Sequence, residues 1–134
     1  MSDFTGERVI PGKVNEDLWA EHVARYAFAR RFTAGKRVLD LGCGTGYGTA
    51  ELAEQARQTI GIDLAIEAVL YASSHFPGAC FLECSATALP FTASSFDVVT
   101  AFEVIEHLDD WSSMIEEARR VLDPKGLLIV STPI

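Results

Sequence analysis

The sequence predicts an α/β protein in which a parallel β-sheet is wrapped by helices. Short apolar runs alternate with longer amphipathic stretches along the 134 residues, as in strands joined by crossover helices. The first run leads directly into a turn with a glycine at every second position, Gly42, Gly44 and Gly46. Because open parallel sheets bind ligands at the carboxyl ends of their strands, these observations predict a doubly wound sheet with a ligand site after its first strand.

Each expected element follows from its apolar pattern. Short apolar runs predict strands near 37–41, 58–62, 79–83, 96–101 and 127–131. Amphipathic stretches predict helices from 45–48 to about 55, over about 65–75, and from near Asp110 to before Pro124. Since aspartate is a preferred N-cap, Asp109 or Asp110 is expected to begin the last helix. The segment 81–95 is expected to be mostly loop.

A further helix is expected before the first strand, over 15–32. Its sequence places five side chains on one face, which predicts packing over the sheet: Leu18, Trp19, His22, Val23 and Tyr26. The length suits one domain with a single core, so 1–134 is expected to form one domain, in which 1–35 are an N-terminal capping segment and helix.

The composition argues against several function classes. Apolar residues make up 49% of the chain and charged residues 22%, which is typical of globular proteins. The formal net charge of -8 leaves no basic stripe, so nucleic acid is not an expected partner. No apolar run approaches the roughly 20 residues that cross a bilayer, and the acidic N-terminus lacks the basic start of a signal peptide. We therefore expect no membrane partner and a cytoplasmic location.

Three cysteines, Cys43, Cys80 and Cys84, are too few for a disulfide framework and include no Cys-x-x-Cys pair. Cys80 and Cys84 are four residues apart on or beside an expected strand, roughly 13 Å, which is too far for a disulfide bond. All three are interpreted as packing residues. Cys43 lies inside the glycine turn, where no base neighbours it in sequence, so a catalytic thiol is not favoured.

The glycine spacing narrows the class of ligand. A glycine turn after a buried strand forms a backbone-lined cradle, or alternatively serves only tight packing of strand against helix. The dinucleotide fingerprint needs glycines at its first, third and sixth positions, which fall here on Gly42, Gly44 and Tyr47. The fingerprint for a nicotinamide cofactor therefore lacks its third glycine in this chain.

Four motifs occur in order: Val-Leu-Asp-Leu-Gly-Cys-Gly-Thr-Gly at 38–46, Gly-Ile-Asp at 61–63, Leu-Pro-Phe with Ser-Phe-Asp-Val-Val at 89–99, and Glu-Val-Ile-Glu-His-Leu at 103–108. In this order the chain resembles the N-terminal part of class I S-adenosylmethionine-dependent methyltransferases, of the type 11-like small-molecule group. The resemblance implies a Rossmann-like doubly wound parallel sheet, truncated after the fifth strand, with S-adenosylmethionine as cofactor.

The resemblance assigns the amino-acid end of the cofactor to the first motif. Backbone amides of Gly42, Cys43 and Gly44, with the following helix N-terminus, are expected to hold the methionine carboxylate. Asp40 is expected either to orient the turn and meet the amino group through water, or only to brace the loop. Both interpretations of Asp40 stay open.

The adenosine end is assigned to the next two strands. Asp63 is expected to accept hydrogen bonds from both ribose hydroxyls, and Leu64 to lie against the adenine ring or in the core. Many relatives have an aspartate where this chain has Ser85, whose hydroxyl is a weaker acceptor for the adenine amino group. Ser85 either makes that contact or only shapes a turn, and Ala86 is expected to offer its amide to the ring.

The segment after the fourth strand carries the candidate chemistry. Glu103 is expected at the mouth of the cofactor site. Methyl transfer to a hydroxyl needs alignment and a base, and His107, with an ordinary pKa of about 6.5, is the candidate catalytic base. Its alternative role is to line the pocket or brace the loop. Glu103, Glu106 and His107 also resemble the metal-binding triplet of some ubiquinone-pathway O-methyltransferases, but no metal is assigned.

Two further expectations concern the ends of the chain. Residues 6–12 and 21–26 resemble a methyltransferase subgroup whose leading segment folds over the cofactor, so that Arg25 or Tyr26 contacts its methionine end; the alternative is a capping helix with Tyr26 in the core. The open edge of the fifth strand predicts a homo-oligomer.

The expected function is methylation of a small-molecule acceptor at oxygen or nitrogen, and the alternative is a non-catalytic or incomplete module that binds S-adenosylmethionine or S-adenosylhomocysteine.

Overall fold

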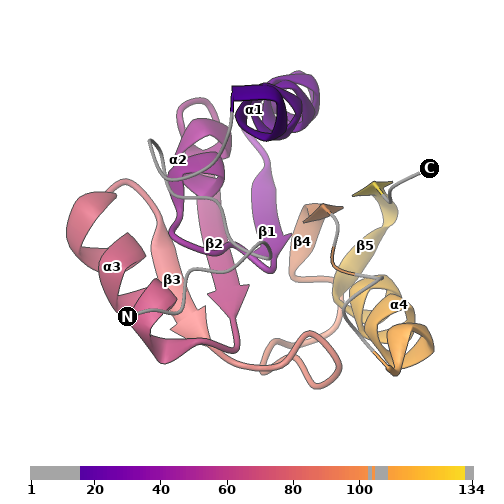
Figure 1. The fold of residues 1–134 in the computed structure, drawn as a ribbon. Coiled ribbons are helices and arrows are strands. Elements are labelled where there is room, and N and C mark those ends of the chain that lie inside the picture. The colour runs from indigo at the N-terminus through magenta and orange to yellow at the C-terminus, as the bar shows by residue number, and fades with distance from the viewer. Residues whose placement is uncertain (1–15, 103, 105–108, 132–134) are drawn as a thin grey trace.

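The computed structural model describes residues 16–102, 104 and 109–131 (Figure 1). A five-stranded sheet has the order β3-β2-β1-β4-β5, and all of its pairings are parallel. The predicted doubly wound parallel sheet is thereby confirmed. Its elements are α1 (Glu16–Arg30), β1 (Arg37–Leu41), α2 (Tyr47–Ala53), β2 (Gln58–Asp63), α3 (Ile66–His75), β3 (Cys80–Glu83), β4 (Phe96–Phe102), α4 (Trp111–Val121) and β5 (Leu122–Ser131).

The central strands β1 and β4 are buried on both faces. Alternate residues of a strand point to opposite faces, and each face has its own apolar cluster. One cluster lies under α1 and α2 and contains Tyr26, Ala29, Val38, Leu52, Val98 and Phe102. The other lies under α4 and includes Leu39, Leu41, Val99, Met114, Ala118 and Val121. Figure 1 shows α1 beside α2, with α4 apart from both.

The packing face of α1 differs in part from the expected one. Tyr26 is buried as expected, but Leu18 is 50% exposed and Val23 is 38% exposed. The fully buried Ala29, one turn after Tyr26, marks the line along which α1 meets the sheet. The apolar pattern gave weight to large side chains, whereas the close approach of α1 depends on this small residue.

β5 begins earlier than expected, at Leu122 rather than near 127. Its register with β4 is irregular, because Phe96 pairs with Leu122 while Val98 pairs with Leu127. The extra residues, 123–126, include Pro124 and Gly126, which are typical of turns. A proline has no N–H to donate, but a bulge in a strand that pairs on one side only among the described residues tolerates this.

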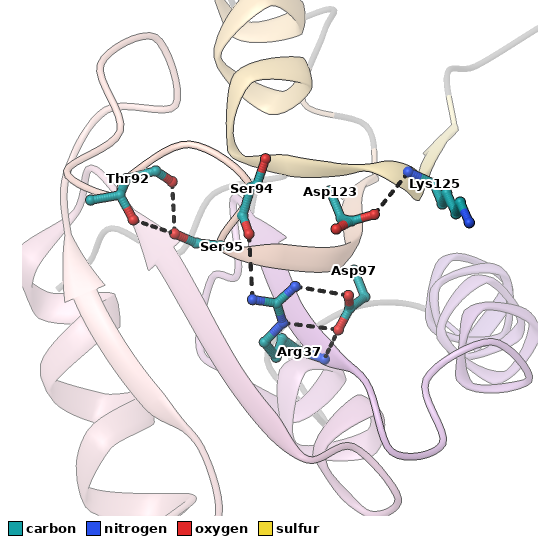
Figure 2. Close-up of polar contacts among 7 residues, drawn as sticks. All are labelled: Arg37, Thr92, Ser94, Ser95, Asp97, Asp123 and Lys125. Atoms are coloured by element: carbon teal, nitrogen blue, oxygen red, sulfur yellow. Dashed lines mark hydrogen bonds and ion pairs between the residues drawn. The ribbon is translucent and has the colours of Figure 1, made fainter.

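An ion pair joins the amino ends of β1 and β4 (Figure 2). Arg37 Nη2 lies 2.9 Å from Asp97 Oδ1, and Arg37 Nε donates to Asp97 Oδ2 over 3.0 Å. These bonds and one from the Arg37 backbone N–H lower the pKa of Asp97 to about 2. The central strands are therefore tied together at the edge opposite their carboxyl ends.

Of the remaining sequence expectations, some are confirmed and one is wrong. Asp110 is the N-cap of α4, because it accepts a hydrogen bond from the Ser113 N–H over 3.2 Å, as predicted. Cys43 is buried and Cys84 half-buried, but Cys80 is exposed on the edge strand β3, so its interpretation as a packing residue was wrong. Among the described residues, no helix has both the length and the apolar character needed to cross a membrane.

Candidate functional site

The glycine turn joins β1 to α2 over residues 42–46. Gly42, Gly44 and Gly46 have φ angles of 71°, 57° and 95°, a region that L side chains rarely adopt. The Cys43 N–H donates to the Ile62 carbonyl over 2.8 Å, which fixes the turn against the end of β2. The sequence therefore uses glycine here to bend the backbone sharply at the carboxyl edge of the sheet.

Asp63 is the last residue of β2 and is half-buried beside this turn. Its Oδ2 accepts the Gly44 N–H over 2.9 Å, and its Oδ1 accepts the Ala65 N–H over 3.0 Å. A carboxylate has about four lone-pair sites, so each oxygen retains capacity for a further donor. Asp63 thus braces the glycine turn and still presents acceptors at the edge of the sheet.

Three other predicted residues follow β2 and β3 along the same edge. Leu64 is 63% exposed, the largest fraction among the large apolar side chains that the structure describes, which disfavours its interpretation as core. Ser85 Oγ accepts the Thr87 N–H over 3.1 Å and lies 2.7 Å from Thr87 Oγ1, so it shapes a turn. Ala86 is buried. The Cys84 N–H donates to the Asp63 carbonyl over 3.1 Å and holds this loop to β2.

Asp40 is fully buried beneath the turn and accepts three hydroxyl hydrogen bonds. Thr49 Oγ1 donates over 2.7 Å, Thr100 Oγ1 over 2.7 Å and Tyr26 Oη over 2.9 Å. Desolvation raises the pKa of Asp40 to about 6, and the three hydrogen bonds oppose that rise. Of the two interpretations of Asp40, the structure gives direct contacts for the one in which it braces the loop.

The turn residue Cys43 has no features of a nucleophile. Burial raises the pKa of its thiol, and the charges of Asp40 and Asp63 raise it further. The thiol is therefore protonated at neutral pH, whereas a reactive cysteine needs its thiolate. This finding agrees with a packing role for Cys43.

Aromatic residues of α1 cover the start of α2. Trp19 lies 4.5 Å and His22 lies 5.2 Å from Tyr47, measured between ring centroids. Burial lowers the pKa of His22 to about 4, with a smaller contribution from Arg25, so this imidazole is neutral at pH 7. Arg25 itself pairs with Glu21 at 3.6 Å. The rings pack on one another, so they form a wall beside the glycine turn.

Sequence reasoning missed the side chains that hold the loop after β3. Glu117 Oε1 accepts the Leu89 N–H over 2.7 Å, and Arg120 donates to the carbonyls of Phe91 and Leu89 over 2.7 Å and 3.0 Å. Both charged residues lie on α4, one turn apart, and also pair with each other at 2.7 Å. Their spacing of three residues on the helix could have predicted the ion pair between them, but nothing in the sequence indicated which backbone groups they would bind.

The candidates Glu103 and His107, and Glu106 of the metal triplet, lie outside the described residues. Val104 is described, and a side chain at Gly42 would come within 2.8 Å of its Cγ2. Val104 therefore lies close to the glycine turn. Among the residues that the structure describes, no group of three His, Cys, Asp or Glu side chains is placed to hold a metal ion.

These features together fit an adenosine ligand with an amino-acid tail. Gly42 is exposed at a sharp bend, Asp63 retains acceptor capacity for a diol, and the exposed Leu64 side chain next to it offers an apolar surface. A carboxylate that ends the second strand is the usual ribose-binding feature of doubly wound sheets. The chemistry of this donor set therefore agrees with the cofactor that the motifs imply.

Comparisons with known proteins agree with this interpretation. Residues 39–130 match a family model described as a methyltransferase domain. Over 131 residues the chain is 40% identical to a Mycolicibacterium smegmatis protein named a probable S-adenosylmethionine-dependent methyltransferase, covering 97% of this chain and 51% of that protein. It is also 33% identical over 120 residues to the ubiquinone biosynthesis O-methyltransferase of Azorhizobium caulinodans, covering 87% of this chain and 47% of that protein.

A solved structure has the same fold. The crystal structure of the YcgJ protein of Bacillus subtilis superimposes with a TM-score of 0.77 at 27% sequence identity, covering 81% of this chain and 50% of that one. The chain thus spans about half the length of the curated relatives and of the solved structure that it matches.

Proposed function

The chain belongs to the class I S-adenosylmethionine-dependent methyltransferases, as the N-terminal part of such a domain, and on this premise we propose that it binds S-adenosylmethionine and supports methylation of a small-molecule acceptor. The observation that carries the proposal is the placement of Asp63 at the carboxyl end of β2, directly bonded to the glycine turn. One carboxylate there would join the ribose site to the site for the amino-acid tail.

The proposed contacts follow the cofactor from tail to base. The N–H groups of Cys43 and Gly44 already donate within the protein, to the Ile62 carbonyl and to Asp63. The exposed backbone at Gly42 would therefore hold the carboxylate, with Asp40 beneath the turn supplying negative charge toward the amino group. Asp63 would accept from the ribose hydroxyls. Leu64, Ser85 and Ala86 would border the adenine, and Glu103 the mouth of the site.

When bound, the cofactor would supply a methyl group already activated on a sulfonium. The protein then has to align the acceptor, exclude water and remove a proton where the acceptor is a hydroxyl or a protonated amine. We propose His107 as that base, from its motif alone. The named relative from A. caulinodans is an O-methyltransferase, which favours oxygen as the acceptor atom.

A second candidate function is a module that binds S-adenosylmethionine or S-adenosylhomocysteine without turnover. It is favoured by one observation: the described residues that fit a ligand are binding groups, Asp63 and the glycine turn, whereas the candidate base His107 rests on its motif alone. A methyl-donor turnover screen on the isolated chain separates the two functions. Turnover that His107→Asn abolishes, with cofactor affinity retained, would support catalysis and the base role together.

Calorimetric titration with S-adenosylmethionine, S-adenosylhomocysteine and NAD tests the binding proposal. We expect both sulfur compounds to bind and NAD not to bind, because the nicotinamide fingerprint lacks its third glycine. A folded chain with no measurable affinity for either sulfur compound would contradict the proposal. Binding of NAD alone would replace it with a dinucleotide function.

Two proposals concern the state of the chain in the cell. We propose that it self-associates through β5, which pairs only with β4 among the described residues and exposes Leu127 and Val130. A cytoplasmic location is also proposed. Fractionation of cells that produce the chain tests the second proposal, and sedimentation, described below, tests the first.

A further inference from the structure

Tyr26 reaches from α1 to the strand that precedes the glycine turn. Its hydroxyl donates to Asp40, and the exposed fractions of the two residues are 2% and 0%. The ring meets Phe102, at the end of β4, edge to face with centroids 4.9 Å apart, and it covers Gly48 of α2. One side chain therefore contacts three elements that surround the turn.

Asp40 ties the turn itself. Thr49 and Asp40 stand on either side of residues 42–46, so the hydrogen bond from Thr49 closes the turn. Thr100 brings β4 to the same carboxylate. All three donors to Asp40 are neutral hydroxyls, and a buried carboxylate depends strongly on each such donor.

We propose that Tyr26 is a positioning residue for the cofactor: through Asp40 it fixes the geometry of the glycine turn that holds the amino-acid end. This inference rests on the proposed function. Tyr26 does not itself contact the cofactor, because its hydroxyl is buried and already bonded to Asp40. The resemblance implied a direct contact at Tyr26, and the packing favours an indirect role instead.

The charge of Asp40 provides a readout of this coupling. Desolvation raises the pKa of Asp40 to about 6, and the hydrogen bond from Tyr26 is one of three that lower it. The titratable groups around it are Asp63 at the end of β2, Cys43 in the turn, and Tyr26 and His22 on α1. Burial raises the pKa of Cys43 and of Tyr26 and lowers that of His22 to about 4, so those three do not titrate near pH 6.

The binding experiment uses Tyr26→Phe, which keeps the ring and removes the hydroxyl. Affinity for S-adenosylhomocysteine is measured by calorimetry between about pH 5 and pH 8. We expect the variant to lose about 3- to 30-fold in affinity at neutral pH, as for a residue that acts through another side chain. The pH midpoint of binding should also move upward, because the pKa of Asp40 loses one hydrogen bond that lowers it.

Tyr71→Phe is the matched control, because Tyr71 lies on α3 and its ring stacks on His75 at 3.9 Å. It should leave affinity and midpoint unchanged. Wild-type affinity and midpoint in Tyr26→Phe would overturn the inference. A loss of affinity that is equal at every pH would also overturn it, because it would indicate a direct contact with the cofactor.

A second measurement needs neither a variant nor a ligand. In the free wild-type chain, NMR should show the Asp40 carboxyl carbon, the Tyr26 ring carbon that bears the hydroxyl, and the amides of residues 42–46 titrating with one midpoint at about pH 6. Turn amides that do not follow Asp40 would overturn the inference even if the cofactor binds. A shared titration in a chain without affinity for S-adenosylhomocysteine would support the coupling and contradict the proposed function.

Discussion

The ring of Tyr26 lies directly against the backbone of Gly48: a Cβ at Gly48 would come within 2.3 Å of Tyr26 Cε2. This close approach lets α1 dock on the start of α2, and only the absence of a side chain permits it. The hydroxyl of the same ring then reaches Asp40. A glycine in the second helix thereby determines how the first helix meets the glycine turn.

Gly48→Ala is expected to destabilise the chain. The added methyl group overlaps the Tyr26 ring, and such overpacking typically costs about 1–3 kcal/mol. Gly78→Ala is the matched control, because a Cβ there meets nothing within 4 Å, and we expect a change of at most about 0.5 kcal/mol. Urea unfolding measures both, and equal stabilities of the two variants would contradict this packing.

Asp63→Asn is expected to weaken binding of S-adenosylhomocysteine by roughly 10- to 100-fold, because hydrogen bonds to a charged acceptor are lost or weakened. Glu83→Gln serves as control, since Glu83 is the partner of Asp63 in the register of β2 with β3 and has no assigned role. Calorimetry compares the two variants. Unchanged affinity in Asp63→Asn would remove the ribose assignment.

Asp97→Asn is expected to lower stability at neutral pH and to flatten its acid dependence. The pKa of Asp97 is lowered to about 2 by Arg37, so its stabilising effect is fully present above the unfolded pKa of about 3.9 and is lost as pH falls toward about 2. The two side chains are about 30% exposed, so the effect should be modest and decrease with salt. Unfolding curves at several pH values measure the difference between wild type and variant, which should shrink in acid.

Arg120→Ala is expected to loosen the loop after β3. Arg120 holds the carbonyls of Leu89 and Phe91 and orients Glu117, which accepts the Leu89 N–H. We expect exchange of the Leu89 amide hydrogen to become several-fold faster. Arg119→Ala is the control, since the side chain of the exposed neighbour Arg119 makes no hydrogen bond or ion pair within the described part of the chain. Identical exchange in both variants would contradict the contacts.

Self-association through β5 is expected to be concentration-dependent. Leu127→Lys places a charge on this strand, where Leu127 is 40% exposed, and charges are a common means of blocking edge-to-edge pairing. Sedimentation velocity should show a larger species for the wild type and a monomer for the variant. A wild type that remains monomeric over a broad range of concentrations would count against this proposal.

The strands and the position of Asp63 at the end of β2 could be predicted from the sequence because both follow local patterns. Asp63 is the last residue of an apolar run, and the glycines at 42, 44 and 46 have a spacing that is typical of a sharp turn after a buried strand. The early start of β5 was missed because Pro124 and Gly126 are typical of turns, and only the pairing with β4 reveals a bulge. Local composition carries no information about such a partner.

The buried cluster of hydroxyl groups around Asp40 was harder to predict from the sequence. Its donors come from positions 14, 9 and 60 residues away, on three separate elements. A signal existed in that Asp40 and Thr100 are polar residues within buried strands, and the register pairs them. Which hydroxyl from α1 or α2 would reach them depends on how the helices dock.

The distance between the two ends of β1 has a consequence for protein engineering. The Arg37–Asp97 pair joins the amino ends of β1 and β4 (Figure 2). The glycine turn follows Leu41, at the opposite, carboxyl end of β1. Mutant libraries confined to the end that carries this ion pair should change heat tolerance with little effect on ligand selectivity. Libraries at the other end should diversify selectivity on an unchanged scaffold, so the two searches are expected to combine without conflict.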